Sequence, residues 1–260
     1  MNRLPELSYF FPAHNEADNL GGLVAEALAS LPVLAERFEI IVVDDGSRDA
    51  TPALADELAS RHPEIRVVHH PTNLGYGAAL RSGFAAARFE VLGFTDGDRQ
   101  FRVADLGRLL DVIGASRSGG PDVVVGFRLR RADPLVRTVY ARLYRLANRI
   151  FFGLRVRDVD CACKVFRRTA LDGIAVESGG AFFSAELLIK LQAAGHRIEE
   201  VGVPHYPRVA GSPTGAKPSV VLRAVRDFWS LRLRLWASPR TALRRGRPIL
   251  GESPANRSAP

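Results

Sequence analysis

Short apolar runs and amphipathic segments alternate along most of the chain. Runs of β-branched and aromatic residues predict buried strands, and segments with apolar residues every three or four positions predict helices. The predicted strands are residues 7–11, 38–43, 65–69, 91–95, 122–127, 164–168 and 198–203, with helices after Asn15 and Thr51 and over 75–89, 103–113, 135–152, 184–194 and 220–236. This alternation predicts an α/β fold whose Rossmann-like, mostly parallel sheet is flanked by helices.

Local signals place several boundaries. Pro12 is expected to end the first strand, and Thr51 to cap the helix that has Pro52 in its first turn. The helix over 135–152 is amphipathic. Its predicted inward face consists of Leu135, Val139, Leu143, Leu146, Ala147 and Ile150.

Charge divides the chain into parts. Residues 217–260 hold ten basic and two acidic residues, which accounts for the whole net charge of +8. We therefore expect a main domain over 1–216, a C-terminal amphipathic helix over 217–236 and a disordered basic tail over 237–260. A basic segment of this kind favours an acidic partner, either anionic lipid or nucleic acid.

The cysteine count and hydropathy indicate the compartment. The chain has two cysteines, Cys161 and Cys163, which are too close in sequence for an ordinary disulfide, and we interpret them as packing residues. Without a second pair nearby they make a poor zinc site. No apolar run reaches the ~18 residues of a membrane span. We expect a cytoplasmic protein, with peripheral attachment to the cytoplasmic face of the membrane as a further expectation.

Acidic residues follow the strand over 91–95. Asp96 and Asp98 flank Gly97, and Gln100 adds an oxygen at the next alternate position. Hard oxygen donors in this pattern suit Mg²⁺ or Mn²⁺, and a divalent ion held there would serve a diphosphate. An ordinary acidic turn after a strand is the alternative interpretation of an isolated Asp-x-Asp.

Two other strand ends are also polar, at residues 12–16 and 44–47. Because ligands of open α/β sheets bind at the carboxyl ends of the strands, we expect the three segments to converge on one ligand. The glycine-rich start of the helix over 75–89 supplies backbone N–H groups for the same ligand, although on its own it is a plain helix cap, which is the preferred interpretation of Gly77.

Eight segments together resemble the family 2 glycosyltransferases of the GT-A fold, and within them the dolichol-phosphate mannose synthase type. They are residues 12–16, 43–51, 73–84, 95–101, 126–128, 160–168, 185–188 and 208–212, in the order of the family. The resemblance covers nearly all of the chain before the tail, and eight motifs in order are far more specific than any one of them.

The resemblance implies inverting, metal-dependent transfer from a nucleotide sugar of the GDP-mannose or UDP-glucose type to a polyprenyl (dolichyl or undecaprenyl) phosphate. It implies metal contacts at Asp96, Asp98 and Gln100, and phosphate contacts at Arg128 and Arg131, where a solvated arginine loop is the alternative. The implied nucleotide-sugar contacts are Pro12, His14, Glu16, Val43, Asp45, Gly75, Asp96, Gly97 and Arg208. Asp98, Arg128, Arg131 and Glu186 are the candidate catalytic residues.

Glu186 bears on the identity of the acceptor. A polyprenyl phosphate is already ionised and needs no base, whereas a hydroxyl on a lipid, polysaccharide or small molecule would need one, and Glu186 is the candidate. A structural glutamate at a helix start is the alternative interpretation.

Two residues depart from the pattern of the family. His14 stands where the family often has tyrosine, and Lys217 comes later than the lysine expected after residues 208–212.

The helix over 220–236 mixes aromatic and arginine residues, which suits a lipid interface as well as a helix packed on the domain. Nucleic-acid binding through the tail is a remote alternative, and no nucleic acid is expected.

Overall fold

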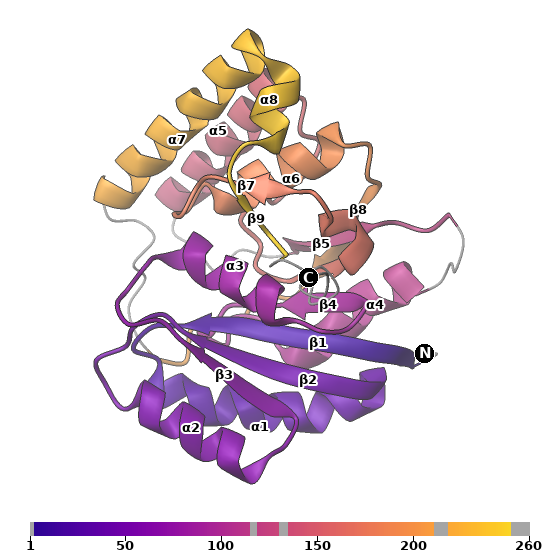
Figure 1. The fold of residues 1–260 in the computed structure, drawn as a ribbon, viewed down its shortest axis with the longest axis vertical. Coiled ribbons are helices and arrows are strands. Elements are labelled where there is room, and N and C mark those ends of the chain that lie inside the picture. The colour runs from indigo at the N-terminus through magenta and orange to yellow at the C-terminus, as the bar shows by residue number, and fades with distance from the viewer. Residues whose placement is uncertain (1–2, 115–118, 130–134, 211–217, 251–260) are drawn as a thin grey trace, which may run out of the picture.

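A computed structural model describes residues 3–114, 119–129, 135–210 and 218–250 of the 260-residue chain (Figure 1). Its main sheet has seven strands in the order β3-β2-β1-β4-β6-β5-β8. All neighbouring pairs are parallel except the two that β6 makes with β4 and β5. The predicted mostly parallel sheet with flanking helices is therefore confirmed.

The strands and helices follow the alternation seen in the sequence. The strands are β1 Leu4–Ala13, β2 Ala35–Asp44, β3 Ile65–His69, β4 Val91–Phe94, β5 Val123–Arg128, β6 Lys164–Arg167, β7 Ala175–Val176, β8 Ile198–Val203 and β9 Arg247–Pro248. The α-helices are α1 Ala17–Leu34, α2 Thr51–Arg61, α3 Tyr76–Ala86, α4 Leu106–Gly114, α5 Leu135–Phe152, α6 Phe183–Ala193, α7 Pro218–Ala237 and α8 Pro239–Arg244, and Val103–Asp105 and Arg168–Leu171 form 3-10 turns.

An aromatic cluster joins the two halves of the sheet. Phe10 on β1, Phe94 on β4 and Phe166 on β6 are buried beneath Phe84 of α3. The ring of Phe84 meets those of Phe10 and Phe166 edge-on, with centroids 4.9 and 5.2 Å apart. Such pairs add about 1 kcal/mol each beyond the burial of their area, so the cluster fixes α3 against the strands that carry the polar ends.

Several boundaries differ from the prediction. β1 continues through Pro12 to Ala13, where Pro12 pairs with Val43 of the parallel neighbour β2. Ala50 rather than Thr51 is the N-cap of α2, and the Thr51 hydroxyl accepts a hydrogen bond from the Glu16 backbone instead. This contact joins the start of α2 to the segment between β1 and α1. No residue near Thr51 in the sequence predicts it.

The predicted inward face of α5 is wrong in part. Leu143, Leu146 and Ile150 are 57, 52 and 66% exposed, whereas Ala147 packs on the core as expected. The helix turns its aromatic end inward instead, with the ring of Phe152 4.8 Å from that of Phe228 on α7. Periodicity predicts an apolar face for the helix, but it does not show which residues of that face meet the rest of the fold. The side chains of Leu135 and Val139 lie outside the described residues.

The tail predicted to be disordered is partly ordered. Residues 239–248 form α8 and β9, and β9 pairs antiparallel with β7. The N–H of Ile249, a fully buried residue, also donates to the carbonyl of Ile174. This contact anchors the chain to the domain as far as residue 250. Residues 251–260, also assigned to the tail, lie outside the described residues.

Candidate functional site

Three polar strand ends meet at one edge of the sheet. β2, β1 and β4 are parallel neighbours, so the residues after Asp44, Ala13 and Phe94 share the carboxyl edge. The N–H of Asp45 donates to the carbonyl of Ala13 at 2.8 Å. A Cβ on Gly97 would lie 2.7 Å from the carbonyl oxygen of Pro12, so only glycine permits this approach. The three segments therefore meet at one edge of the sheet, and the single ligand predicted for them stays a prediction.

The Asp45 carboxylate builds the glycine-rich turn before α3. One oxygen accepts hydrogen bonds from His70 Nδ1 at 2.7 Å and the Leu74 N–H at 2.9 Å, and the other accepts from the Gly75 N–H at 2.9 Å. Gly75 has a φ of +95°, which favours glycine. Asp45 therefore shapes this part of the site from a buried position, and its predicted nucleotide contact stays a prediction.

The segment after β1 forms the adjoining wall. His14 Nδ1 donates to the Asp45 carbonyl at 3.0 Å, and the Asn15 N–H donates to the Ser47 hydroxyl at 2.9 Å. Glu16 accepts a hydrogen bond from Asn19 at 2.6 Å. Burial raises the pKa of Glu16, and the nearby charge of Asp98 adds to the effect. Glu16 thus lies within electrostatic range of the predicted metal ligands.

Asp96 carries the most strongly perturbed carboxylate of this edge. It accepts a hydrogen bond from the Tyr76 hydroxyl of α3 at 2.9 Å. Burial and the charge of Asp98 raise its pKa to about 7. Two close carboxylates that repel each other in this way favour an added cation.

Asp98 and Gln100 are held from the opposite side by Arg208. An Arg208 guanidinium nitrogen lies 2.5 Å from Asp98 and 3.3 Å from the Gln100 side-chain oxygen. The Gln100 N–H donates to the other Asp98 oxygen at 3.0 Å, and the Gln100 carbonyl accepts from the Tyr206 N–H at 3.0 Å. Residues 98, 100 and 208 thus lie together, and their predicted contacts with the metal and the nucleotide sugar stay predictions.

The donor set fits a divalent ion shared with a diphosphate. Among the residues that the structure describes, no group of three or more His, Cys, Asp or Glu forms a metal cage of its own. Mg²⁺ and similar ions are commonly held by one or two carboxylates together with substrate phosphates. Asp96 and Asp98 match this arrangement. The charge of Asp98 helps to raise the pKa of Asp96, and a bound cation would relieve the repulsion between the two carboxylates.

Arg128 lies at the end of β5 and makes a bidentate pair. Its Nε and Nη2 lie 2.7 and 2.8 Å from the two carboxylate oxygens of Asp158. Burial of the guanidinium opposes its charge, but the hydrogen bonds that it donates to Asp158 outweigh burial and raise the pKa of Arg128 above its usual value. The predicted phosphate contact of Arg128 stays a prediction, and Arg131 lies outside the described residues.

Glu186 is buried near the start of α6. Its two oxygens accept the N–H groups of Glu177 and Ser178, each at 2.9 Å, and Lys190 lies 2.9 Å from one of them. Both oxygens are therefore engaged with the loop before α6. These contacts agree with the structural interpretation of Glu186, and its role as a base stays a prediction.

Two partners of the site were missed in the sequence. Tyr76 lies between Gly75 and Gly77, and the sequence signal at this point, the start of a helix, comes from the two glycines and not from the tyrosine side chain. Asp158 precedes the cysteine segment and has no strand-end position to mark it. Only the fold brings Tyr76 to Asp96 and Asp158 to Arg128.

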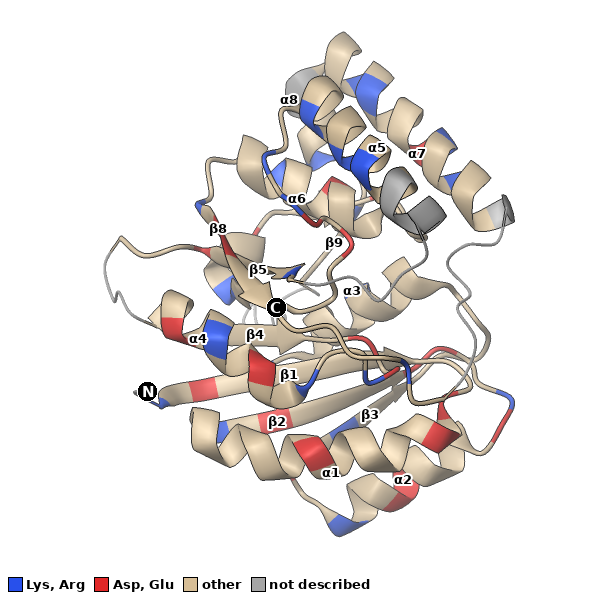
Figure 2. Cartoon of the chain, turned by 180° about the vertical axis from the view of Figure 1, so that it is seen from behind, with Lys and Arg blue, Asp and Glu red and all other residues tan. Residues whose placement is uncertain are grey.

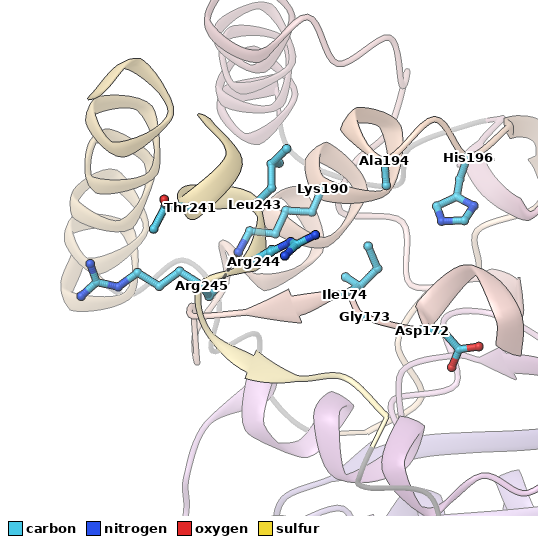
Figure 3. Close-up of a pocket in the computed structure, with 10 residues that line it drawn as sticks. All are labelled: Asp172, Gly173, Ile174, Lys190, Ala194, His196, Thr241, Leu243, Arg244 and Arg245. Carbon is cyan, nitrogen blue, oxygen red and sulfur yellow. Dashed lines mark hydrogen bonds between the residues drawn. The ribbon is translucent and has the colours of Figure 1, made fainter. Parts of the chain in front are cut away.

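A separate cavity of about 940 Å³ lies between α6, β7 and α8 (Figure 3). Lys190, His196, Arg244 and Arg245 give it a basic lining. The Lys190 ammonium is already occupied by Glu186 and by the carbonyls of Ala175 and Arg245. None of the residues predicted for the site lines this cavity.

Comparison with solved structures agrees with the fold. The glucosyl-3-phosphoglycerate synthase of Mycobacterium tuberculosis in complex with phosphoglyceric acid superposes with a TM-score of 0.68 at 21% identity, over 87% of this chain and 79% of that one. The same enzyme with Mn²⁺, uridine diphosphate and glucosyl-3-phosphoglycerate gives a TM-score of 0.67 at 20% identity, with the same coverage. The GT-A fold expected from the sequence is confirmed.

Sequence comparison gives relatives that are longer than this chain. Glycosyltransferase AglD of Haloferax volcanii is 36% identical over 241 residues, which are 89% of this chain and 37% of the relative. The polyprenol monophosphomannose synthase of Mycolicibacterium smegmatis is 32% identical over 212 residues, 77% of each protein. An undecaprenyl-phosphate 4-deoxy-4-formamido-L-arabinose transferase of Pseudomonas fluorescens is 33% identical over 170 residues, 65% of this chain and 48% of the relative. The chain thus spans between about a third and three quarters of these relatives.

A family model also matches the chain. The model of glycosyl transferase family 2 matches residues 8–174, which include all three converging strand ends. Because it covers more than half of the chain, this match shows that the chain belongs to glycosyl transferase family 2.

Proposed function

We propose that this chain transfers a sugar, with inversion, from a nucleotide sugar of the GDP-mannose or UDP-glucose type to a polyprenyl phosphate. The observation that carries the proposal is the convergence of residues 12–16, 44–47 and 95–101, with Asp96 and Asp98 at its centre. Relatives named as polyprenol monophosphomannose synthase and undecaprenyl-phosphate transferase support the acceptor class.

Asp96, Asp98 and Gln100 would hold Mg²⁺ or Mn²⁺. The ion supplies Lewis-acid stabilisation of the leaving nucleoside diphosphate. The solved complex that contains both Mn²⁺ and uridine diphosphate supports a divalent ion. Arg208, which contacts both Asp98 and Gln100, is placed to meet the diphosphate as well, because a guanidinium binds phosphate oxygens through a planar fork.

The remaining donor contacts follow from the walls of the site. His14 and Glu16 lie on the segment after β1, and Pro12 and Val43 pair across β1 and β2 beneath it. Gly75 and Gly97 allow the backbone to approach a ligand closely. We assign this wall to the nucleoside and the carboxylates to the diphosphate and metal.

A phosphate acceptor fits the position of Glu186. Its two oxygens accept two backbone N–H groups, and Lys190 pairs with one of them, so the carboxylate is engaged before any substrate binds. An ionised phosphate needs no general base. The hydroxyl-acceptor alternative, which depends on Glu186 as base, gains no support from these contacts.

Membrane contact is proposed through α7 together with α5. Both helices carry exposed apolar side chains. They are Leu143, Leu146 and Ile150 on α5 and Leu222, Leu233 and Trp236 on α7. The three on α7 are 72, 58 and 79% exposed. Arginines are interspersed among them (Figure 2). The mixture suits the interface of an anionic bilayer. None of the described helices is long and apolar enough to cross a membrane.

A transfer assay tests the proposed reaction. The protein is incubated with Mn²⁺, undecaprenyl phosphate and radiolabelled GDP-mannose or UDP-glucose, and label is counted in the organic phase. We expect label to be transferred from one donor, and Asp98→Asn to reduce the rate by at least roughly a hundredfold because a metal ligand is lost. Asp111→Asn, which changes an exposed acid of α4, is the matched control. Transfer by the wild type to a hydroxyl acceptor alone would contradict the proposal.

A further inference from the structure

The loop over residues 177–180 is held by a buried carboxylate. Glu186 is 3% exposed, and each of its oxygens accepts a backbone N–H of the loop, from Glu177 and from Ser178. Hydrogen bonds to an ionised acceptor are stronger than neutral ones. One side chain therefore fixes the backbone of two successive loop residues.

Lys190 completes this arrangement one turn further along α6. Its ammonium lies 2.9 Å from Glu186 and donates to the carbonyls of Ala175 and Arg245, each at 2.7 Å. The buried charge of Glu186 is thus paired and hydrogen-bonded. The same contacts tie the loop to β7 and to the segment after α8.

The other side of the loop lies against the first turn of α3. The Gly77 N–H donates to the Gly179 carbonyl at 3.1 Å. A Cβ on Gly77 would lie 2.8 Å from the Gly179 carbonyl carbon, and a Cβ on Gly75 would lie 2.9 Å from its oxygen. Both glycines are thus required by the close approach of this loop. Arg81, on the next turn of α3, donates to the carbonyls of Val176 and Ser178.

Tyr76 lies between these two glycines and extends to the proposed metal site. Its hydroxyl donates to Asp96 at 2.9 Å. A continuous series of contacts therefore runs from Glu186 through the loop backbone and Gly179 to the start of α3, and from there to Asp96. Displacement of the loop would move the residue that orients a proposed metal ligand.

We propose that Glu186 is a positioning residue of the donor site. It acts through the backbone of residues 177–180 on the first turn of α3, and so keeps the Tyr76 hydroxyl on Asp96. The proposal rests on the assignment of the donor site made above. It replaces a proton-transfer role for Glu186 with a geometric one.

The same loop is also joined to α7. The Ser178 hydroxyl donates to Asp227 at 3.0 Å, and Glu177 pairs with Arg234. Ser178→Ala therefore loosens the loop from the opposite side without changing Glu186. This variant tests the loop separately from the carboxylate.

Steady-state kinetics of Glu186→Gln separate the two roles. Glutamine has one acceptor oxygen, so one loop N–H is left facing an NH₂ group. We expect the KM for the nucleotide sugar to rise roughly tenfold with kcat within about threefold, and the shape of the pH profile of kcat to be unchanged. Glu57→Gln, on the exposed face of α2, is the matched control. A lower kcat with unchanged donor KM, together with loss of the acid limb of the profile, would show a general base and overturn the proposal.

A double-mutant cycle tests the path through Tyr76. Tyr76→Phe removes the hydroxyl from Asp96, and we expect it to weaken nucleoside diphosphate binding in the presence of Mn²⁺. Combined with Glu186→Gln it should lose little more than the larger single effect, because both changes act on one contact. Fully additive losses would overturn the proposal.

Hydrogen exchange supplies a readout that needs no ligand. The Gly77 amide should exchange at least roughly tenfold faster in Glu186→Gln, because its acceptor on Gly179 is released. If Glu186→Gln does not fold, Ser178→Ala carries the same predictions, and an unchanged donor KM and Gly77 exchange in that variant overturn the proposal. A wild type that binds no nucleotide would refute the donor site and this inference together, whereas a wild type that binds, with an unchanged KM in Glu186→Gln, refutes this inference alone.

Discussion

Arg128 and Asp158 form a buried charge pair at the end of β5. Arg128 and Asp158 are 12 and 6% exposed at their side chains and form two parallel hydrogen bonds. Removal of one partner from such a pair leaves an uncompensated buried charge. The pair therefore contributes to folding as well as to the placement of the end of β5.

Asp158→Ala should lower the free energy of unfolding by about 3 kcal/mol, because Arg128 loses its bidentate partner in a buried setting. Glu57→Ala, which breaks the exposed pair with Arg61 on α2, should cost no more than about 0.5 kcal/mol. Urea denaturation of both variants gives the comparison. Equal losses in the two variants would contradict the assigned role of the pair.

At the scale of elements, the end of β2 is tied to β3 and α2 by one histidine. His69 Nδ1 lies 2.9 Å from Asp44, and its Nε2 lies 3.0 Å from Asp56. The hydrogen bonds to Asp44 and Asp56 raise the pKa of His69 above its usual 6.5. Burial opposes ionisation of Asp44, but hydrogen bonds from Ser47 and His69 lower its pKa below the usual 3.8.

The pH dependence of stability follows from the raised pKa of His69 and the lowered pKa of Asp44. The contribution of His69 is fully present below pH 6.5 and is lost as the pH rises through its raised pKa in the folded state. The contribution of Asp44 is present above pH 3.8 and is lost only as the pH falls through its lowered pKa. His69→Gln should therefore destabilise the protein more at pH 5.5 than at pH 9, as measured by thermal unfolding. The same loss at both values would show that the charge of His69 contributes nothing.

The sequence was informative wherever a residue and its neighbours in the chain determine structure. Residues 65–69 and 198–203 are strands with the predicted bounds, and the strand ends at Asp44 and Asp96 meet because parallel neighbours share an edge. Contacts between residues that are distant in the sequence could not be predicted from it. The Tyr76 contact with Asp96 and the hold of Glu186 on residues 177–178 depend on where α3 and α6 pack.

At the scale of the whole molecule, the proposed donor site and the exposed apolar side chains of α5 and α7 belong to different parts of the fold. Asp96 and Asp98 follow β4 in the sheet, whereas α5 and α7 lie beside each other at the opposite end of the long axis from α1 and α2 (Figure 1). The rings of Phe151 and Trp229 meet at 5.1 Å and join the two helices. The two helices proposed to contact the membrane are therefore held together.

Leu222→Asp combined with Trp236→Asp should abolish binding to vesicles that contain phosphatidylglycerol, because two exposed apolar anchors become acidic. Flotation with the vesicles measures the bound fraction. Val33→Asp, at another exposed apolar position, on α1, should bind as the wild type does. Equal binding by the double variant and the wild type would contradict membrane contact through α7.

Calorimetric titration with UDP and with GDP, each with and without Mn²⁺, tests whether the converging strand ends form a metal-dependent nucleotide site. We expect that one nucleotide binds, that binding requires the metal, and that Asp98→Asn weakens it by at least roughly tenfold while Asp111→Asn does not, because only Asp98 is a proposed ligand. Absence of binding by the folded wild-type protein with Mn²⁺ present, or equal binding by Asp98→Asn, would contradict the account.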